Sequence, residues 1–159
     1  MVFSIDEGAR SAQEDDISVI TELACQAIAE KVQQRGGEVW SLKEARCPSI
    51  EMGLRRDLAD NCISVVVGTI DEEIVGYGVA SLIKLHDDST LGRISDLYVM
   101  PEARGVGVGE AIIRLLIDWA CKHDCTGVDS IALPGDRHTK NFFETHGLVA
   151  RSITVHRKL

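Results

Sequence analysis

The sequence contains no hydrophobic run of the roughly 18 residues that a membrane-spanning helix requires, so we expect no membrane segment. Its first residues, MVFSIDEGARSAQEDD, lack a basic stretch followed by an apolar one. We therefore expect no signal peptide and a cytoplasmic location. At 159 residues with 45% hydrophobic and 26% charged residues, the chain has the size and composition of one folded domain, residues 1–159.

Basic residues are in the minority, and the formal net charge is −8. This balance argues against a nucleic-acid partner, because phosphate backbones are bound by basic surfaces. The acidic excess lies before residue 90, whereas the remainder is nearly balanced. An acidic first half would attract a cationic substrate, although a solvated surface explains the pattern as well.

Paired CxxC motifs are also missing from the sequence. The five cysteines are an odd number in mostly apolar surroundings, so we expect reduced, buried thiols. The segment CKHDC (121–125) has metal-ligating side chains, but no second cluster completes a set of four ligands. We expect no metal site.

The spacing of apolar residues predicts alternating strands and helices. In order, these are a strand at 8–13, a helix from 17 to about 32, an irregular segment at 38–48, a helix from 49 to about 61, strands at 63–67 and 74–83 joined as a hairpin, a strand at 93–100, a helix at 107–123, a strand at 128–133, a helix at 137–146 and a last strand at 148–156. This order indicates the α/β class, with a mixed sheet covered by helices on both faces.

Three glycines at alternate positions, in PEARGVGVGEAII (101–113), precede the helix at 107–123. Glycines let the backbone approach an anion closely, and the first N–H groups of a helix have no partner inside it. The loop of nucleotide hydrolases requires Lys and Ser/Thr after its last glycine, where this chain has Glu110 and Ala111. The dinucleotide fingerprint fits only weakly, because Glu110 occupies its third glycine position.

The pattern Arg/Gln-x-x-Gly-x-Gly/Ala is met by Arg104, Gly107 and Gly109. Together with its context, LYVMPEARGVGVGEAIIRLL, it resembles motif A of the GNAT superfamily of N-acetyltransferases. The resemblance implies a mixed, mostly antiparallel sheet of about six to seven strands, flanked by four helices and splayed at a cofactor cleft.

The same resemblance implies acetyl-CoA as the acetyl donor. Backbone N–H groups between Arg104 and Glu110 would hold its pyrophosphate; the implied residues are Arg104, Gly105, Val106, Gly107, Val108, Gly109 and Glu110. Leu97, Tyr98 and Val99 match the strand that pairs with the pantetheine arm. An N–H group of this strand would polarise the thioester carbonyl.

A second segment, DRHTKNFFETHGLVA, is similar to the family motif Asn-x-x-Ala-x-x-Phe-Tyr-Glu-x-x-Gly-Phe. Asp136 and Thr139 stand where this motif contacts the cofactor, and Phe143 replaces the tyrosine that protonates the leaving thiolate. We expect Phe143 to pack beside the pantetheine. Water, Tyr98 or His138 would then donate the proton, or the thiolate would leave unassisted, since a thiol has a pKa of about 8.5.

An amine acceptor must lose a proton before it attacks, and Asp96 is the candidate base nearest in sequence to the cofactor strand. The stretch ISDLYVMPEARGVGVG resembles diamine acetyltransferases, in which a Glu stands at the position of Ser95. Strand alternation predicts that Asp96 shares a face with Ile94 and Tyr98. The alternative is a structural role for Asp96 near Arg93, and Tyr98 is either a core aromatic or part of the acceptor pocket.

The resemblance places the acceptor wall in the first helices and their loop, so that Trp40 and residues 38–60 would set specificity. Further candidates for the base are Glu51, Asp57 and His86, and candidates for a carboxylate clamp are Arg46, Arg55 and Arg56. The acidic residues favour an amine acceptor, and the basic ones argue against a simple polyamine.

Two functions follow from these residues. The first is direct acetyl transfer to a primary amine, on a small molecule or a protein, without a metal. The second is an acyl-CoA-binding module that has lost catalysis. The apolar alternation of ARSITVHRKL also predicts a final strand that closes the sheet or pairs across a homodimer.

Overall fold

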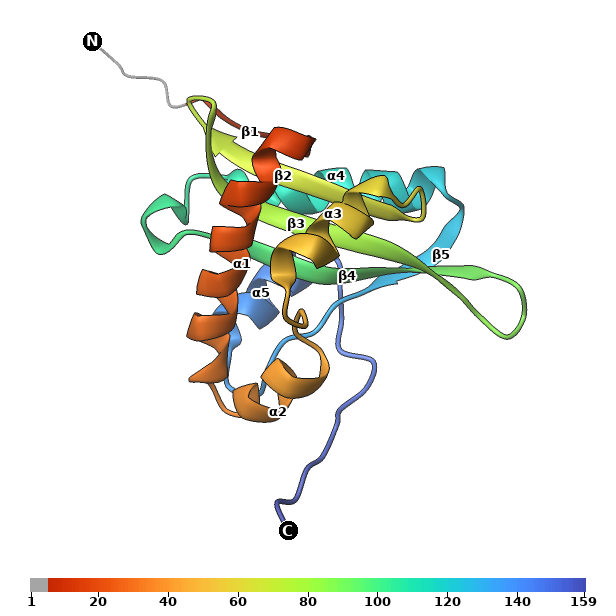
Figure 1. Cartoon of the computed structure of the whole chain (residues 1–159). Coiled ribbons are helices and arrows are strands. Elements are labelled where there is room, and N and C mark those ends of the chain that lie inside the picture. Colours follow the sequence, from red (N-terminus) through yellow and green to blue (C-terminus); the bar gives the residue numbers. More distant parts are fainter. Residues whose placement is uncertain (1–5) are drawn as a thin grey trace.

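The sheet has five strands, seen in a computed structural model that describes residues 6–159. In sheet order they are β1 (Glu7–Ser11), β2 (Ile63–Ile70), β3 (Glu73–Lys84), β4 (Thr90–Val99) and β5 (Cys125–Asp129). All neighbours are antiparallel except β4 and β5, which are parallel. The predicted α/β fold with a mixed, mostly antiparallel sheet is confirmed (Figure 1).

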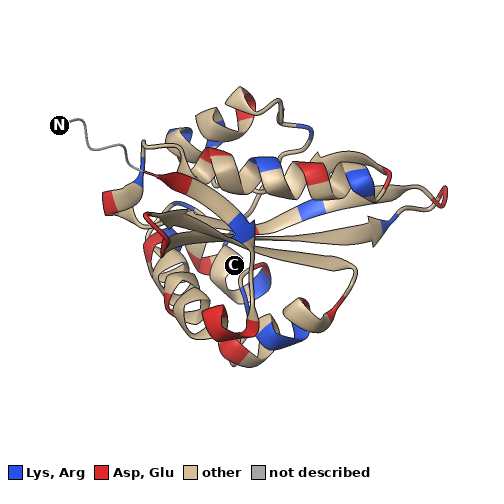
Figure 2. Ribbon diagram, turned by 90° about the horizontal axis from the view of Figure 1, so that it is seen from above, with Lys and Arg blue, Asp and Glu red and all other residues tan. Residues whose placement is uncertain are grey.

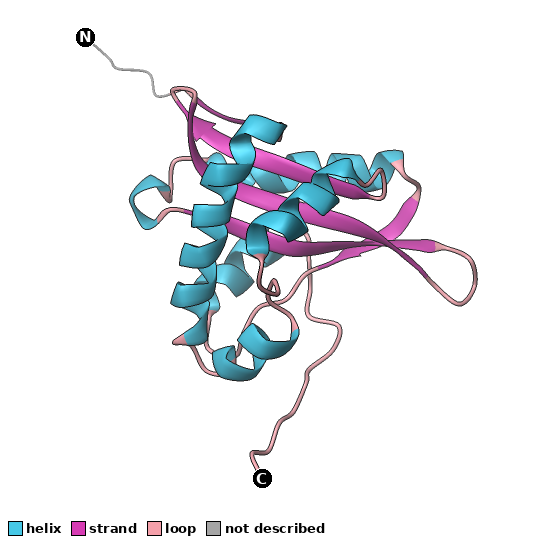
Figure 3. Cartoon of the chain, viewed as in Figure 1, coloured by secondary structure: helices cyan, strands magenta, loops and turns pink. Residues whose placement is uncertain are grey.

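Helices cover both faces of the sheet. They are α1 (Ile17–Val32), α2 (Gly37–Lys43), α3 (Ile50–Ala59), α4 (Val108–Lys122) and α5 (Arg137–Thr145). The apolar stripes of α1 and α3 pack on one face and that of α4 on the other, which produces two core layers (Figures 1 and 3). A Cβ atom on Gly78 would lie 2.6 Å from Ile112 Cγ2, so this glycine lets α4 approach the sheet closely.

The strand count is lower than the predicted six to seven. Residues 148–156 form no strand, and the segment extends away from the domain with Ile153 86% and Val155 89% exposed (Figure 3). Alternation alone does not make a strand, because a strand needs a neighbour for its backbone hydrogen bonds. The strand predicted at 128–133 is β5, which begins at Cys125 and ends at Asp129.

One helix more than predicted lies in the segment that we expected to be irregular. Gly36 adopts a left-handed conformation with φ of 80°, ends the turn after α1 and caps α2. The sequence does carry a signal for α2, because Glu38 lies in its first turn and Lys43 in its last, where each charge favours the helix dipole.

A β-bulge in β4 overturns the predicted alternation. Val79 of β3 pairs with Asp96 and Ala80 pairs with Ile94, which leaves Ser95 as an extra residue. The strand therefore changes phase, and Ile94 packs toward α4, whereas Tyr98 packs toward α1. Asp96 shares a face with Tyr98 but not with Ile94.

The cysteines are free, but the predicted burial is wrong. Cys25, Cys47, Cys62 and Cys121 are exposed and Cys125 is half-buried, because they lie on outward faces or in loops. Between residues 6 and 159, no group of three His, Cys, Asp or Glu side chains could hold a metal ion. No helix in this range has the length and apolar character needed to cross a membrane.

Candidate active site

A cleft opens where β4 and β5 part. Their parallel pairing ends at Arg93 and Asp129, and beyond it β4 continues to Val99 beside β3 alone. Ser130 Oγ donates a hydrogen bond to the Ile94 carbonyl oxygen at 3.1 Å, at the apex of the opening. The splayed sheet implied by the family resemblance is therefore present.

The backbone of β4 presents polar groups to this cleft. Met100 N donates to the Val75 carbonyl oxygen at 2.9 Å, so its N–H points toward β3. Because N–H groups alternate along a strand, the N–H groups of Val99 and Leu97 point away from β3 and into the cleft. The Val99 carbonyl oxygen on the same edge accepts from Arg104 Nε at 2.9 Å.

The glycine loop lies directly before α4. Gly105 and Gly107 have φ of 82° and 102°, a region that side chains rarely adopt. Gly107 is the N-cap of the 15-residue α4 and supplies no side-chain cap, and the first helical bond joins Ala111 N to Gly107 O at 2.9 Å. The N–H groups before Ala111 are thus available to an anion at the positive end of the helix dipole.

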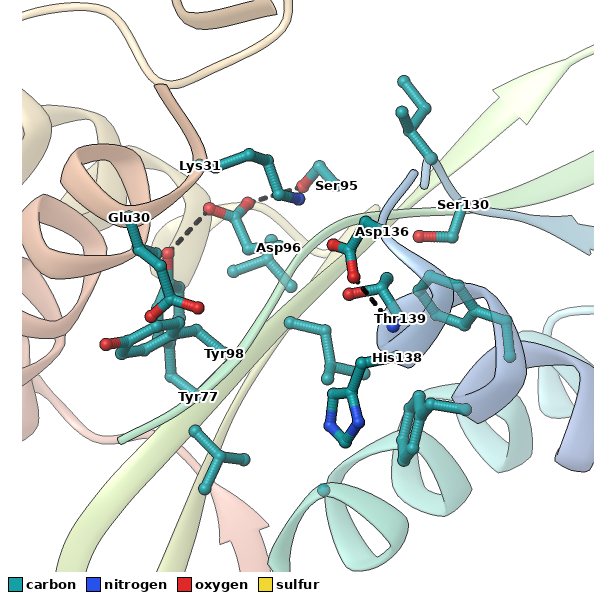
Figure 4. Close-up of a pocket in the computed structure, with 18 of the residues that line it drawn as sticks. Glu30, Lys31, Tyr77, Ser95, Asp96, Tyr98, Ser130, Asp136, His138 and Thr139 are labelled. Carbon is teal, nitrogen blue, oxygen red and sulfur yellow. Dashed lines mark hydrogen bonds between the residues drawn. The ribbon is translucent and has the colours of Figure 1, made fainter. Parts of the chain in front are cut away.

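Loop and cleft open into one cavity of about 760 Å³, which extends to α1, α2 and α3 (Figure 4). All predicted cofactor residues line it except Val106 and Val108; those that do are Leu97, Tyr98, Val99, Arg104, Gly105, Gly107, Gly109, Glu110, Asp136, Thr139 and Phe143. The Val108 side chain is buried between α4 and the sheet, and the Val106 side chain is exposed. Both can still contribute backbone groups to the loop.

Asp96 lies at the centre of a hydrogen-bond network. It accepts from Arg46 Nε at 2.9 Å and Nη2 at 3.0 Å, from Tyr77 OH at 2.9 Å and from Ser95 Oγ at 2.7 Å. Arg46 Nη1 also pairs with Asp57 at 2.7 Å. Both Asp96 oxygens are therefore engaged, and the structural partner of Asp96 is Arg46 rather than the expected Arg93.

Burial and charge shift the pKa values in this network. Burial acts to lower the pKa of Arg46, but the carboxylates of Asp96 and Asp57 outweigh it and raise the pKa above its ordinary value. Burial raises the pKa of Tyr77 well above its ordinary value, and the Asp96 charge raises it further. Tyr77 is thus a neutral donor and Arg46 a permanent cation.

Tyr98 lies on the α1 side of β4, beside Glu30 (Figure 4). Its ring is 5.4 Å from the Arg104 guanidinium, and Arg104 Nη2 donates to Glu30 Oε2 at 2.8 Å. Burial, followed by the Glu30 charge, raises the pKa of Tyr98. The phenol is both a core aromatic and a cavity residue that remains protonated at neutral pH.

The start of α5 forms the opposite wall. Asp136 Oδ1 accepts from Thr139 N at 3.0 Å and caps this helix, a function of its own besides any ligand contact. Phe143 is 8% exposed and packs edge-on against Phe142, with ring centroids 5.8 Å apart. His138 projects into the cavity from the first turn of α5 (Figure 4).

The predicted acceptor residues divide into two groups. Trp40, Arg46 and Asp57 line the cavity. The others lie elsewhere: Glu51, Arg55, Arg56 and His86 are exposed, and Arg55 pairs with Glu51 across one helical turn. These four belong to the outer surface of α3 and to a hairpin tip.

Our sequence reasoning missed Lys31, which lines the cavity from α1. Its amine lies 4.7 Å from the centre of the Trp40 ring. The signal was available, because position 31 continues the inward stripe of Ala24, Ala27 and Ile28 at helical spacing.

Comparison with known proteins agrees with this geometry. The family model described as the acetyltransferase (GNAT) family matches residues 21–148, and the chain belongs to that family. No curated protein sequence matches. Among solved structures, the tetramutant of the BH1408 protein from Bacillus halodurans has a TM-score of 0.81 at 22% identity, with 95% of this chain and 99% of that chain covered.

Two solved enzymes share the same fold. The aminoglycoside N-acetyltransferase AAC(6')-Iy in complex with CoA has a TM-score of 0.78 at 15% identity, with 99% of each chain covered. Glucosamine-6-phosphate N-acetyltransferase from Arabidopsis thaliana has a TM-score of 0.71 at 17% identity, with 96% of this chain and 98% of that chain covered.

Proposed function

We propose that the protein transfers an acetyl group from acetyl-CoA to a primary amine in a ternary complex. The observation that carries the proposal is the single cavity that joins an anion-binding loop, a free strand edge and a separate wall of side chains. Two of the structural neighbours support the proposal. One is an aminoglycoside N-acetyltransferase in complex with CoA, and the other is a glucosamine-6-phosphate N-acetyltransferase.

Each part of the cavity has a proposed task. The loop from Arg104 to Glu110 binds the pyrophosphate, and the edge of β4 at Leu97 and Val99 pairs with the pantetheine arm. The bound donor supplies an activated acyl thioester. The Val99 N–H donates to the thioester carbonyl oxygen and stabilises the negative charge that develops on it. Asp136, Thr139 and Phe143 contact the arm from the other side.

Two proton transfers complete the proposed reaction. Asp96 is the proposed base, and because its oxygens already accept four hydrogen bonds, the Ser95 hydroxyl is the donor that rotates away. Tyr98 is the proposed donor to the leaving thiolate, since its raised pKa keeps the phenol protonated.

Calorimetric titration with acetyl-CoA tests the loop. Gly107→Glu places a carboxylate at the pyrophosphate position and beside Glu7, whose Cγ would lie 3.3 Å from the new Cβ. We expect the wild type to bind and this variant to lose at least about 100-fold in affinity. Gly147→Glu is the matched control, because Gly147 also has a positive φ, 84°, with open space around it. Equal losses in both variants would contradict the assignment of the loop.

A thiol-release assay over a panel of primary amines then tests catalysis. The second candidate function is a CoA-binding module without turnover. Phe143 favours this candidate, because no phenol stands at this position. Saturable binding of acetyl-CoA with no thiol release for any amine would favour the module. Release that depends on the amine would exclude it.

A further inference from the structure

The Lys31 amine bears on the identity of the acceptor, and the inference drawn from it rests on the proposed function. We infer that Lys31 binds an acidic group of the acceptor, so that the substrate is an amine that also carries a carboxylate or a phosphate. Lys31 lies on the inward face of α1, lines the cavity, and reaches toward β4, with its amine on the side of Ser95, Asp96 and Asp136 (Figure 4).

The other cations of the cavity are already neutralised. Of the three Lys and Arg side chains that line it within the described chain, Arg46 pairs with Asp57 and Asp96, and Arg104 pairs with Glu30. The Lys31 amine alone forms no ion pair and donates no hydrogen bond to any residue between 6 and 159. Figure 2 shows acidic and basic residues interspersed along the helices.

The carboxylates around Lys31 are committed to closer partners. Asp136 caps α5, Asp96 holds Arg46, and Glu30 holds Arg104. They act on Lys31 through space and raise its pKa, but burial has the larger, opposite effect and lowers the pKa. A half-buried ammonium group without a close acceptor is costly, and the Trp40 ring at 4.7 Å compensates only part of that cost. An anion from the ligand would supply the rest.

Gln34, three residues after Lys31 in the turn that follows α1, provides a second and independent observation. It also lines the cavity, and its Oε1 atom is buried without a hydrogen-bond partner within the described residues. Buried polar atoms are nearly always satisfied. A cation and an open acceptor three residues apart that line the same cavity suit a ligand that carries an acidic group next to an N–H or O–H donor.

Paired acceptors that differ only in the acidic group provide the test. Suitable pairs are L-alanine with L-alaninamide for the carboxylate, and glucosamine 6-phosphate with glucosamine for the phosphate. In at least one pair, we expect kcat/KM for the acidic member to be at least about tenfold higher than for the neutral member. This factor corresponds to the contribution of one charge-assisted hydrogen bond. The pair that shows the preference identifies the acidic group.

Three variants locate the preference. Lys31→Met should raise KM for the acidic acceptor about tenfold, leave KM for the neutral one unchanged and preserve acetyl-CoA affinity, whereas Lys31→Arg should retain much of the preference. Lys43→Met is the control, since Lys43 is an exposed lysine that pairs with Glu44. Equal use of acidic and neutral acceptors, or the same loss for both in Lys31→Met, would overturn the inference. Acetylation of Lys31 itself, detected by mass spectrometry, would also overturn it.

A binding measurement separates this inference from the proposed function. The same compounds are titrated into the CoA-loaded wild type and Lys31→Met proteins and followed by NMR chemical shifts. Selective, Lys31-dependent binding of the acidic members supports the anion site even if no thiol is released. Absence of such selectivity rejects the anion site even if other amines are acetylated.

Discussion

The two halves of the cavity are built in different ways. In the donor half, the polar groups of a strand edge, a glycine loop and a helix N-terminus come from the backbone, and the side chains of Val106 and Val108 lie outside the cavity. The start of α5 adds the side chains of Asp136, Thr139 and Phe143 as the opposite wall. The acceptor half consists of side chains, joined by a buried network around Asp96. The donor half therefore depends on backbone conformation, and the acceptor half depends on residue identity.

The largest expected effect comes from breaking the acceptor-side network. Arg46→Met leaves Asp96 and Asp57 without their cation, and the Arg46 and Asp96 side chains are only 13% and 11% exposed. We expect a loss of about 3 kcal/mol in the free energy of unfolding, because a buried charge without a partner is costly. Urea denaturation measures it. Arg55→Met, at an exposed ion pair, should cost less than about 1 kcal/mol, and equal losses would contradict the distinction.

The next effect concerns the donor half. Gly107→Ala should weaken acetyl-CoA binding about tenfold, because a Cβ at φ of 102° forces the loop to move. Val106→Ala, at the adjacent position but with an exposed side chain, should change affinity less than about twofold. Calorimetry compares them. A larger effect at Val106 would mean that side chains, and not backbone groups, form this half.

A smaller effect is expected where the two halves meet. Phe143→Tyr adds a phenol beside the cleft, and we expect kcat to rise a few-fold at unchanged KM if protonation of the thiolate limits turnover. Steady-state kinetics and a melting curve are compared for the variant and the wild type. An unchanged kcat with a lower melting temperature would show that Phe143 serves packing alone.

The smallest effect is electrostatic. Burial lowers the pKa of Lys31 in the folded chain below its ordinary value of 10.5, so between these two values the unfolded chain binds more protons. The free energy of unfolding therefore increases with pH in that interval. The increase in the free energy of unfolding should be less than about 1 kcal/mol, and Lys31→Met should remove it. Urea midpoints at about pH 8 and about pH 10 measure this difference for both proteins. Parallel curves for wild type and variant would contradict it.

The comparison also explains what could be predicted from the sequence. The loop with Gly105 and Gly107 was recognisable because only glycine tolerates its dihedral angles, and the order of most helices and strands followed from periodicity. The Arg46–Asp96 pair was not predictable, because it joins residues 50 positions apart and depends on how two helices and a strand assemble.

The misassigned segments share a physical cause. The final strand was predicted from alternation, but no neighbouring strand pairs with residues 148–156. The bulge at Ser95 depends on the register between β3 and β4, which periodicity within one strand does not reveal.

The bulge at Ser95 determines which face of the sheet each later residue of β4 occupies. Each residue after it faces the side opposite to the one that unbroken alternation from Ile94 would give it. One inserted residue thus directs Asp96 and Tyr98 to the acceptor side and leaves Leu97 and Val99 on the side of α4. Deletion of Ser95 would leave Asp96 opposite Val79 and Ile94 opposite Ala80, so both sets would keep their faces, whereas regular pairing of Ser95 without the bulge would exchange the two sets at once.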